Sequence, residues 1–212
     1  MSKRHLSSVE LALLALATAA VTANGYYIHP IIAPIAEDFD VSASTIGLVP
    51  AFNQLALALG IFLLLPLGDR FSNRRLISVF VAGQFVGVSV MAFARDFHWF
   101  AAGSTVLGFF TIAPYLLPSY ASKRVDPGQL GHVTAMLTTG VLMGILLARS
   151  GAGVIGEYLG WRTVYYLAAA LMLGMTFLLP LMMEEDETPE EAGELLSYPC
   201  LLYTSDAADE LT

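Results

Sequence analysis

The sequence has 212 residues, of which 56% are hydrophobic and only 13% are charged, whereas an ordinary soluble domain carries about 25% charged residues. This composition excludes a typical soluble domain and indicates a membrane protein. The formal net charge of −8 comes from residues 184–212, which hold ten of the eighteen acids and no Lys or Arg, so it indicates no basic partner, and we expect no nucleic-acid binding.

Six apolar stretches reach or approach the ~20 residues that an α-helix needs to cross a bilayer. They cover residues 9–35, 45–67, 76–94, 97–120, 131–156 and 161–183. The sequence therefore predicts an all-α, polytopic membrane protein, with residues 1–183 forming one transmembrane domain of six helices.

The first stretch begins like a secretory signal, with basic residues before an apolar run. Its apolar character continues to Ala36, which is too long for a cleaved signal, so we expect a retained helix. His29 lies within this helix, and histidine as a residue type is suited to sense or carry protons, so it is a candidate proton sensor or carrier. A histidine that is merely hydrogen-bonded inside the bundle is the commoner alternative.

After the second stretch, the sequence PLGDRFSNRR concentrates charge in Asp69, Arg70, Arg74 and Arg75. Charged side chains are expensive to place in lipid. The cluster therefore predicts a short turn at the membrane surface between the second and third helices.

The fourth stretch repeats a feature of the first, because Pro30 and Pro34 recur as Pro114 and Pro118. Proline removes backbone hydrogen bonds and bends a helix. Since the two helices run in opposite directions, the pattern predicts an inverted repeat of three helices plus three, in which such helices mark a transporter's binding site. Coincidence is the alternative, because proline is frequent in membrane helices.

Small residues at four-residue spacing predict close helix packing in lipid. These pairs are Gly83 with Gly87, Gly140 with Gly144, and Gly156 with Gly160.

Arg149 lies within the fifth stretch, whereas Arg162 stands at the very start of the sixth. A charge at mid-bilayer costs at least ~2.5 kcal/mol, so such a residue usually faces a cavity or a partner. Snorkelling of the side chain to the outer surface is the alternative.

The tail has two parts. Residues 184–199 predict a solvated acidic linker, and from Cys200 onward the sequence CLLYTSDAADE resembles a translated sequencing adapter. We expect residues 200–212 to be an artefact and the native chain to continue past Pro199. Because Cys200 is the only cysteine, no disulfide or cysteine metal site is expected.

Basic residues indicate the orientation. With the N-terminus in the cytoplasm, Arg95 and Arg162 fall outside, and most of the other basic residues fall inside, as the positive-inside bias requires. The inner set is Lys3, Arg4, Arg70, Arg74, Arg75, Lys123 and Arg124. We expect a multi-pass protein of the bacterial cytoplasmic membrane with both termini in the cytoplasm.

The segment LPLGDRFSNRRL resembles the signature loop of the major facilitator superfamily, usually Gly-x-Leu-Ala/Gly-Asp-Arg-x-Gly-Arg-Arg/Lys. The matching residues are Leu67, Gly68, Asp69, Arg70 and Arg74. The sequence departs from the pattern at Leu65, Ser72 and Asn73. The resemblance implies that Asp69, Arg70 and Arg74 form a latch with a second half of the protein that holds the outward-facing state.

Further segments, such as LMGILLARSGAGVIGEYLGWRTVYYLAAAL, are similar to bacterial drug and sugar efflux permeases. This resemblance implies a twelve-helix protein of two halves, with this chain as the N-terminal half. Ser104 stands where many proton-coupled members carry an Arg, and Arg149 replaces the proline of the antiporter motif. Proton antiport therefore does not follow from the resemblance alone.

Polar and aromatic residues in the spans are candidates for binding an amphipathic organic substrate. They are Asn24, Tyr27, His29, Asn53, Gln54, Tyr115 and Arg149. Taken singly, each is more often a packing residue than a ligand contact.

The sequence does not indicate an enzyme, because it has no Ser/His pair, paired mid-span acids, zinc motif or phosphate-binding loop. We expect no enzyme, cofactor or metal, but a gradient-driven transporter that exports a small organic compound, with the proton as coupling ion. Its partners are the lipid bilayer and a missing C-terminal six-helix half. A solute uptake symporter and a non-transporting six-helix scaffold remain alternatives.

Overall fold

The computed structural model describes residues 8–69, 71–122, 124–125 and 127–183. Arg70 of the predicted latch, the linker at 184–199 and the segment 200–212 lie outside the described residues. For Asp69, only the backbone is described.

Six helical spans, each long and apolar enough to cross a membrane, confirm the predicted all-α fold. Span 1 consists of α1 (Ser8–Ala23) and α2 (Ile28–Asp38), and span 2 consists of α3 (Ala43–Ile46), α4 (Leu48–Leu64) and the 3₁₀ helix η1 (Leu65–Asp69). Span 3 is α5 (Asn73–Ala92), and span 4 consists of α6 (Phe97–Phe109) and α7 (Ala113–Ser122). Span 5 consists of η2 (Pro127–Gln129) and α8 (Leu130–Leu159), and span 6 is α9 (Trp161–Met182).

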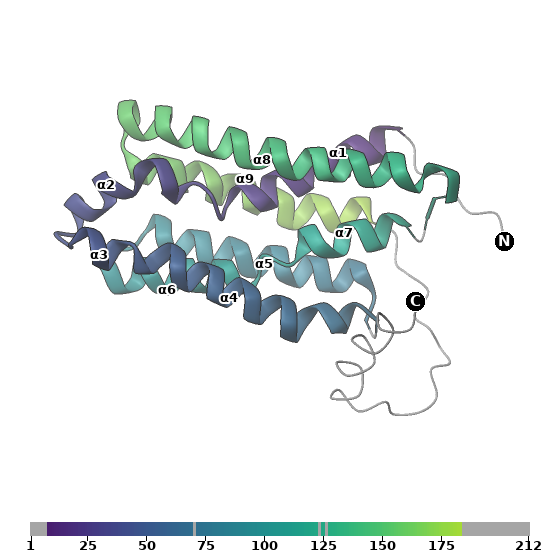
Figure 1. Cartoon of the computed structure of the whole chain (residues 1–212), viewed down its shortest axis with the longest axis horizontal. Helices are drawn as coiled ribbons and strands as arrows, with labels where there is room; N and C mark the ends of the chain where they lie inside the picture. Colours follow the sequence, from purple (N-terminus) through teal and green to yellow (C-terminus); the bar gives the residue numbers. More distant parts are fainter. Residues whose placement is uncertain (1–7, 70, 123, 126, 184–212) are drawn as a thin grey trace, which may run out of the picture.

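The spans lie roughly side by side in one bundle (Figure 1). In that view α8, α2, α7 and α4 lie on the near side, whereas α9, α5 and α6 lie behind them. The start of α1, the end of α9 and η1 gather at one end of the bundle. This is the arrangement that an even number of membrane crossings requires.

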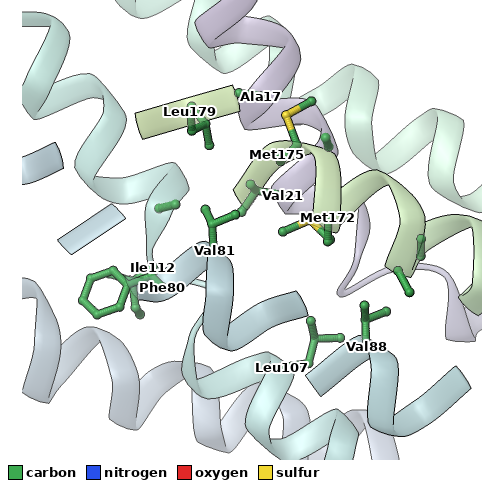
Figure 2. Packing of buried hydrophobic residues seen from close by; sticks show 14 of the residues in the cluster. Ala17, Val21, Phe80, Val81, Val88, Leu107, Ile112, Met172, Met175 and Leu179 are labelled. Carbon is green, nitrogen blue, oxygen red and sulfur yellow. The ribbon is translucent and has the colours of Figure 1, made fainter. Parts of the chain in front are cut away.

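The apolar core lies where α1, α5, α6 and α9 meet (Figure 2). It includes Ala17, Val21, Phe80, Val81, Val88, Leu107, Met172, Met175 and Leu179. Lipid chains are as apolar as these side chains, so the bundle gains from tight packing rather than from removing its helices from water.

Small residues bring α8 against span 1, as their spacing predicts. A Cβ atom at Gly140 or Gly144 would overlap the carbonyl oxygen of Ala15 or Ala19 of α1. The predicted close packing of α8 at these two glycines is therefore confirmed.

Gly83 and Gly87 of α5 also make close contacts, with the ring of Phe110 and the backbone of Leu107. Gly160 behaves differently from its predicted packing partner Gly156. It has φ +84° and ends α8, and a Cβ there would meet nothing within 4 Å. The prediction was wrong for Gly160. This residue ends the helix with a positive φ, a backbone conformation that glycine adopts at no steric cost.

The two spans that carry the repeated proline pairs are interrupted at corresponding places. Span 1 breaks at residues 24–27, just before Pro30, and span 4 breaks at residues 110–112, just before Pro114. A proline cannot donate to the carbonyl four residues earlier and clashes with it. The matching breaks fit the inverted repeat that the sequence predicts.

Candidate functional site

The helix breaks free two backbone carbonyls, and side chains satisfy both. His29 Nδ1 donates to the Tyr26 carbonyl at 3.2 Å, since a carbonyl oxygen can only accept. Gln84 Nε2 donates to the Phe110 carbonyl at 3.5 Å, which also accepts from the Ile112 backbone at 2.8 Å. Broken helices are tolerated in lipid when neighbouring groups satisfy the freed backbone in this way.

Asn24 extends this network. Its Nδ2 donates to Gln84 Oε1 at 3.1 Å, and both side chains are buried. Asn24, Gln84 and the Phe110 carbonyl therefore form a hydrogen-bonded chain that joins the break of span 1 to the break of span 4 across α5. The structure places Asn24 inside the bundle. Sequence reasoning overlooked Gln84, although a single amide in an otherwise apolar span was a usable signal.

Asn53 is also buried, between α4 and α6. Its Nδ2 donates to the Ser104 carbonyl at 2.7 Å and lies 3.4 Å from the Ser104 hydroxyl. A Cβ at Gly108 would overlap the Asn53 carbonyl, so α4 and α6 are in close contact here. A neutral hydrogen-bonded pair thus includes Ser104, the position at which the resemblance implies an arginine in many proton-coupled members.

The other predicted binding residues remain accessible. Gln54 of α4, Tyr115 of α7, His29 of α2 and Arg149 of α8 are exposed, while Tyr27 is half-buried against the core. The exposed four come from the helices on the near side of the bundle in Figure 1. The structure thus separates the predicted set into an accessible group and the two buried amides, Asn24 and Asn53.

Arg149 lies beside Tyr26, which sequence reasoning did not select. Its guanidinium carbon is 5.7 Å from the centre of the Tyr26 ring, and that ring stacks on His29 at 5.7 Å with a 23° interplanar angle. A cation–π contact contributes about 0.5–2 kcal/mol, less than the ~2.5 kcal/mol or more that a mid-bilayer arginine costs. Tyr26 alone therefore does not compensate the charge.

The predicted latch loop is only partly described. Gly68 of η1 packs under α7, where an added Cβ would lie 2.9 Å from Leu116. Ser72 and Asn73, which depart from the family pattern, are buried at the start of α5. Arg74 is half-buried, and its carbonyl accepts from the Ser78 hydroxyl at 2.6 Å. The turn places the start of α5 at the bundle end that holds the start of α1 (Figure 1).

Arg162, expected only as an outer surface charge, joins three spans at the opposite end. It contacts Asp38 Oδ2 at 2.9 Å and donates to the Ala94 carbonyl at 2.7 Å. Its guanidinium also lies 4.3 Å from the centre of the Trp161 ring. These contacts connect α2, the end of α5 and the start of α9.

Within the part of the chain that the structure describes, no group of three or more His, Cys, Asp or Glu residues is placed to hold a metal ion.

Comparisons with known proteins agree with this architecture. A family model described as Major Facilitator Superfamily matches residues 14–198. A crystal structure of the POT family transporter PepTSo superposes with a TM-score of 0.69 over 88% of this chain and 40% of that chain, at 14% sequence identity. At that identity, the likeness concerns the fold.

Two curated relatives carry transporter names. The chain is 34% identical to a protein of Escherichia coli strain K12 named as an uncharacterized transporter, YgaY, over 95% of this chain and 52% of that protein. It is 27% identical to the multidrug efflux pump LfrA of Mycolicibacterium smegmatis, over 85% of this chain and 36% of that protein. The chain thus spans about half the length of YgaY and less of LfrA. It belongs to the major facilitator superfamily, a family of multi-pass membrane transporters of small molecules rather than enzymes.

Proposed function

We propose that the chain is the N-terminal lobe of a secondary active transporter that exports a small organic compound, driven by an ion gradient with the proton as coupling ion. Residues 1–183 form the lobe, residues 184–199 lead to a second six-helix half, and residues 200–212 are an adapter artefact. The host membrane is the bacterial cytoplasmic membrane, with both termini in the cytoplasm.

The exposed face of α2, α4, α7 and α8 carries this proposal. Gln54, Tyr115, His29 and Arg149 present amide, phenol, imidazole and guanidinium groups there. Lipid is a poor environment for these groups, whereas a cavity for an amphipathic solute combines apolar walls with a few polar groups. Export is favoured over uptake because the relative LfrA is an efflux pump.

The latch is part of the proposal. Asp69 ends η1 four residues before α5 begins at Asn73. In this proposal it meets a helix N-terminus, where negative charge is favoured. Arg70 and Arg74 supply cations for acidic groups of the second half or for lipid phosphates.

Transport is tested in cells that express the complete gene, including codons beyond Pro199. We expect lower accumulation of an exported test compound, and this difference should vanish when the proton gradient is collapsed. Asp69→Asn should reduce export about tenfold or more, as expected for the loss of a charge-assisted hydrogen bond of ~1.5 kcal/mol, with membrane insertion unchanged. Raised accumulation would instead indicate uptake, and unaltered accumulation of every compound would favour the scaffold alternative.

A further inference from the structure

Arg149 is exposed, and it lies near the middle of the length of its helix. It is four to five residues from the midpoint of α8 (Leu130–Leu159), which corresponds to about 7 Å along a helix that rises 1.5 Å per residue. Its aromatic partner, Tyr26, lies in the break near the middle of span 1, which runs from Ser8 to Asp38. The guanidinium is thus held against a mid-span ring and not at a span end, where snorkelling would take it.

Arg149 has no acidic partner among the residues that the structure describes. The described acids of the spans are near their ends, as Glu37, Asp38 and Glu157 show. The side chain is exposed. An unpaired cation at this depth is most stable when an anion reaches it from the exposed side.

The neighbouring groups define the kind of anion. Ring stacking leaves the edge of a guanidinium free, and this edge presents two parallel N–H groups that match a carboxylate. The stacked rings of Tyr26 and His29, 5.7 Å apart, continue the site with a flat aromatic surface. Aromatic groups pack favourably on such surfaces in offset or edge-on geometry.

We propose that Arg149, Tyr26 and His29 form a binding subsite for an aromatic carboxylate, with Arg149 binding the carboxylate and the Tyr26–His29 pair contacting the ring. This inference rests on the proposed transport function, since it names the substrate class of the same exposed face. It also gives a role to the arginine that replaces the proline of the antiporter motif.

The test uses the whole chain in phosphatidylcholine nanodiscs and measures binding of 4-fluorobenzoate by fluorine NMR, which detects weak ligands. We expect saturable binding that is at least tenfold weaker for the uncharged isostere 4-fluorobenzamide. Arg149→Gln should weaken 4-fluorobenzoate binding about 10- to 100-fold, the range for losing a hydrogen bond to a charged group. Equal affinity for the acid and the amide, or no binding, would overturn the proposal.

Matched variants separate the subsite from general charge effects. Arg95→Gln removes an exposed guanidinium from the loop after α5 and should leave binding unchanged. Arg149→Lys keeps the charge but loses the planar pair of N–H groups, so it should bind more weakly than the unaltered chain. Tyr26→Phe keeps the ring and should bind within about threefold of the unaltered chain, whereas Tyr26→Leu should not. An Arg149→Gln variant that is as helical by circular dichroism and binds normally would contradict the assignment.

A lipid headgroup is the other source of an anion for Arg149. Replacing half of the phosphatidylcholine by phosphatidylglycerol should leave 4-fluorobenzoate binding within about twofold if the site faces solute. Loss of binding in these nanodiscs would assign Arg149 to lipid and overturn the proposal. Export by the complete protein without benzoate binding by this chain would reject the subsite alone, whereas binding without any flux would reject the transport function.

Discussion

At the residue scale, the polar side chains of this bundle fall into those that repair the backbone and those that remain accessible. Gln84 repairs the break of span 4 and binds Asn24, and His29 accounts for the freed carbonyl of span 1. His29 is also exposed, so it remains available to a solute together with residues such as Gln54 and Arg149. The amides that look most alike in the sequence therefore have different roles.

Gln84→Leu tests the buried chain between the two breaks. The change should lower the free energy of unfolding by about 1–3 kcal/mol, because it leaves Asn24 and the Phe110 carbonyl with one hydrogen bond fewer in a buried place. Denaturation in mixed micelles measures the effect, and Gln54→Leu on the exposed face is the control, expected within about 0.5 kcal/mol of the unaltered chain. Equal stability of the two variants would show that the chain is not needed.

A second prediction at this scale concerns Arg162 and Asp38. Their side chains are 35% and 45% exposed, so solvent screens the pair, and the coupling energy should be only about 0.2–1 kcal/mol. A double-mutant cycle of Asp38→Asn and Arg162→Gln measures it. A coupling of several kcal/mol would mean that the Arg162–Asp38 pair is far less solvated than the structure shows.

At the element scale, sequence patterns predicted the spans and their contacts better than the directions of their side chains. Length and hydropathy were enough for the six spans, and small-residue spacing predicted close packing of α8 but not its partner, α1. The same reasoning did not separate the buried Asn24 and Asn53 from the exposed Gln54, because it did not establish which side of each helix faces the bundle. Tyr26 was overlooked because only packing brings α8 and its Arg149 beside that ring.

The packing of α8 on α1 gives a prediction at the element scale. Gly144→Leu should destabilise the bundle by about 1–3 kcal/mol or more, since the new side chain overlaps the backbone at Ala19 and forces the helices apart. Gly151→Leu on the same helix is the matched control, because a Cβ there meets nothing within 4 Å. Thermal denaturation in detergent compares them, and an equal loss in both would contradict the close contact.

At the scale of the whole molecule, the proposed function makes the six described spans one lobe that supplies one wall of a cavity. Such a lobe inserts into a bilayer but cannot enclose a solute. We therefore expect the 212-residue chain to insert into liposomes and to carry no solute flux above that of protein-free liposomes. Measurable uptake of any candidate compound by these liposomes would show that the chain completes a pathway by itself or by pairing.

In the proposed transporter, the near face, which is the side of the bundle formed by α2, α4, α7 and α8, lines a water-accessible cavity, whereas α5 faces lipid. Single cysteines at Tyr115 and Val86, which are 47% and 54% exposed, test it in the complete protein, with a Cys200→Ser background if that residue is native. A water-soluble thiol reagent should modify Tyr115→Cys and spare Val86→Cys, because thiols react as thiolates in contact with water. If neither cysteine reacted with the reagent, the near face would lie in lipid, and the proposed cavity would be contradicted.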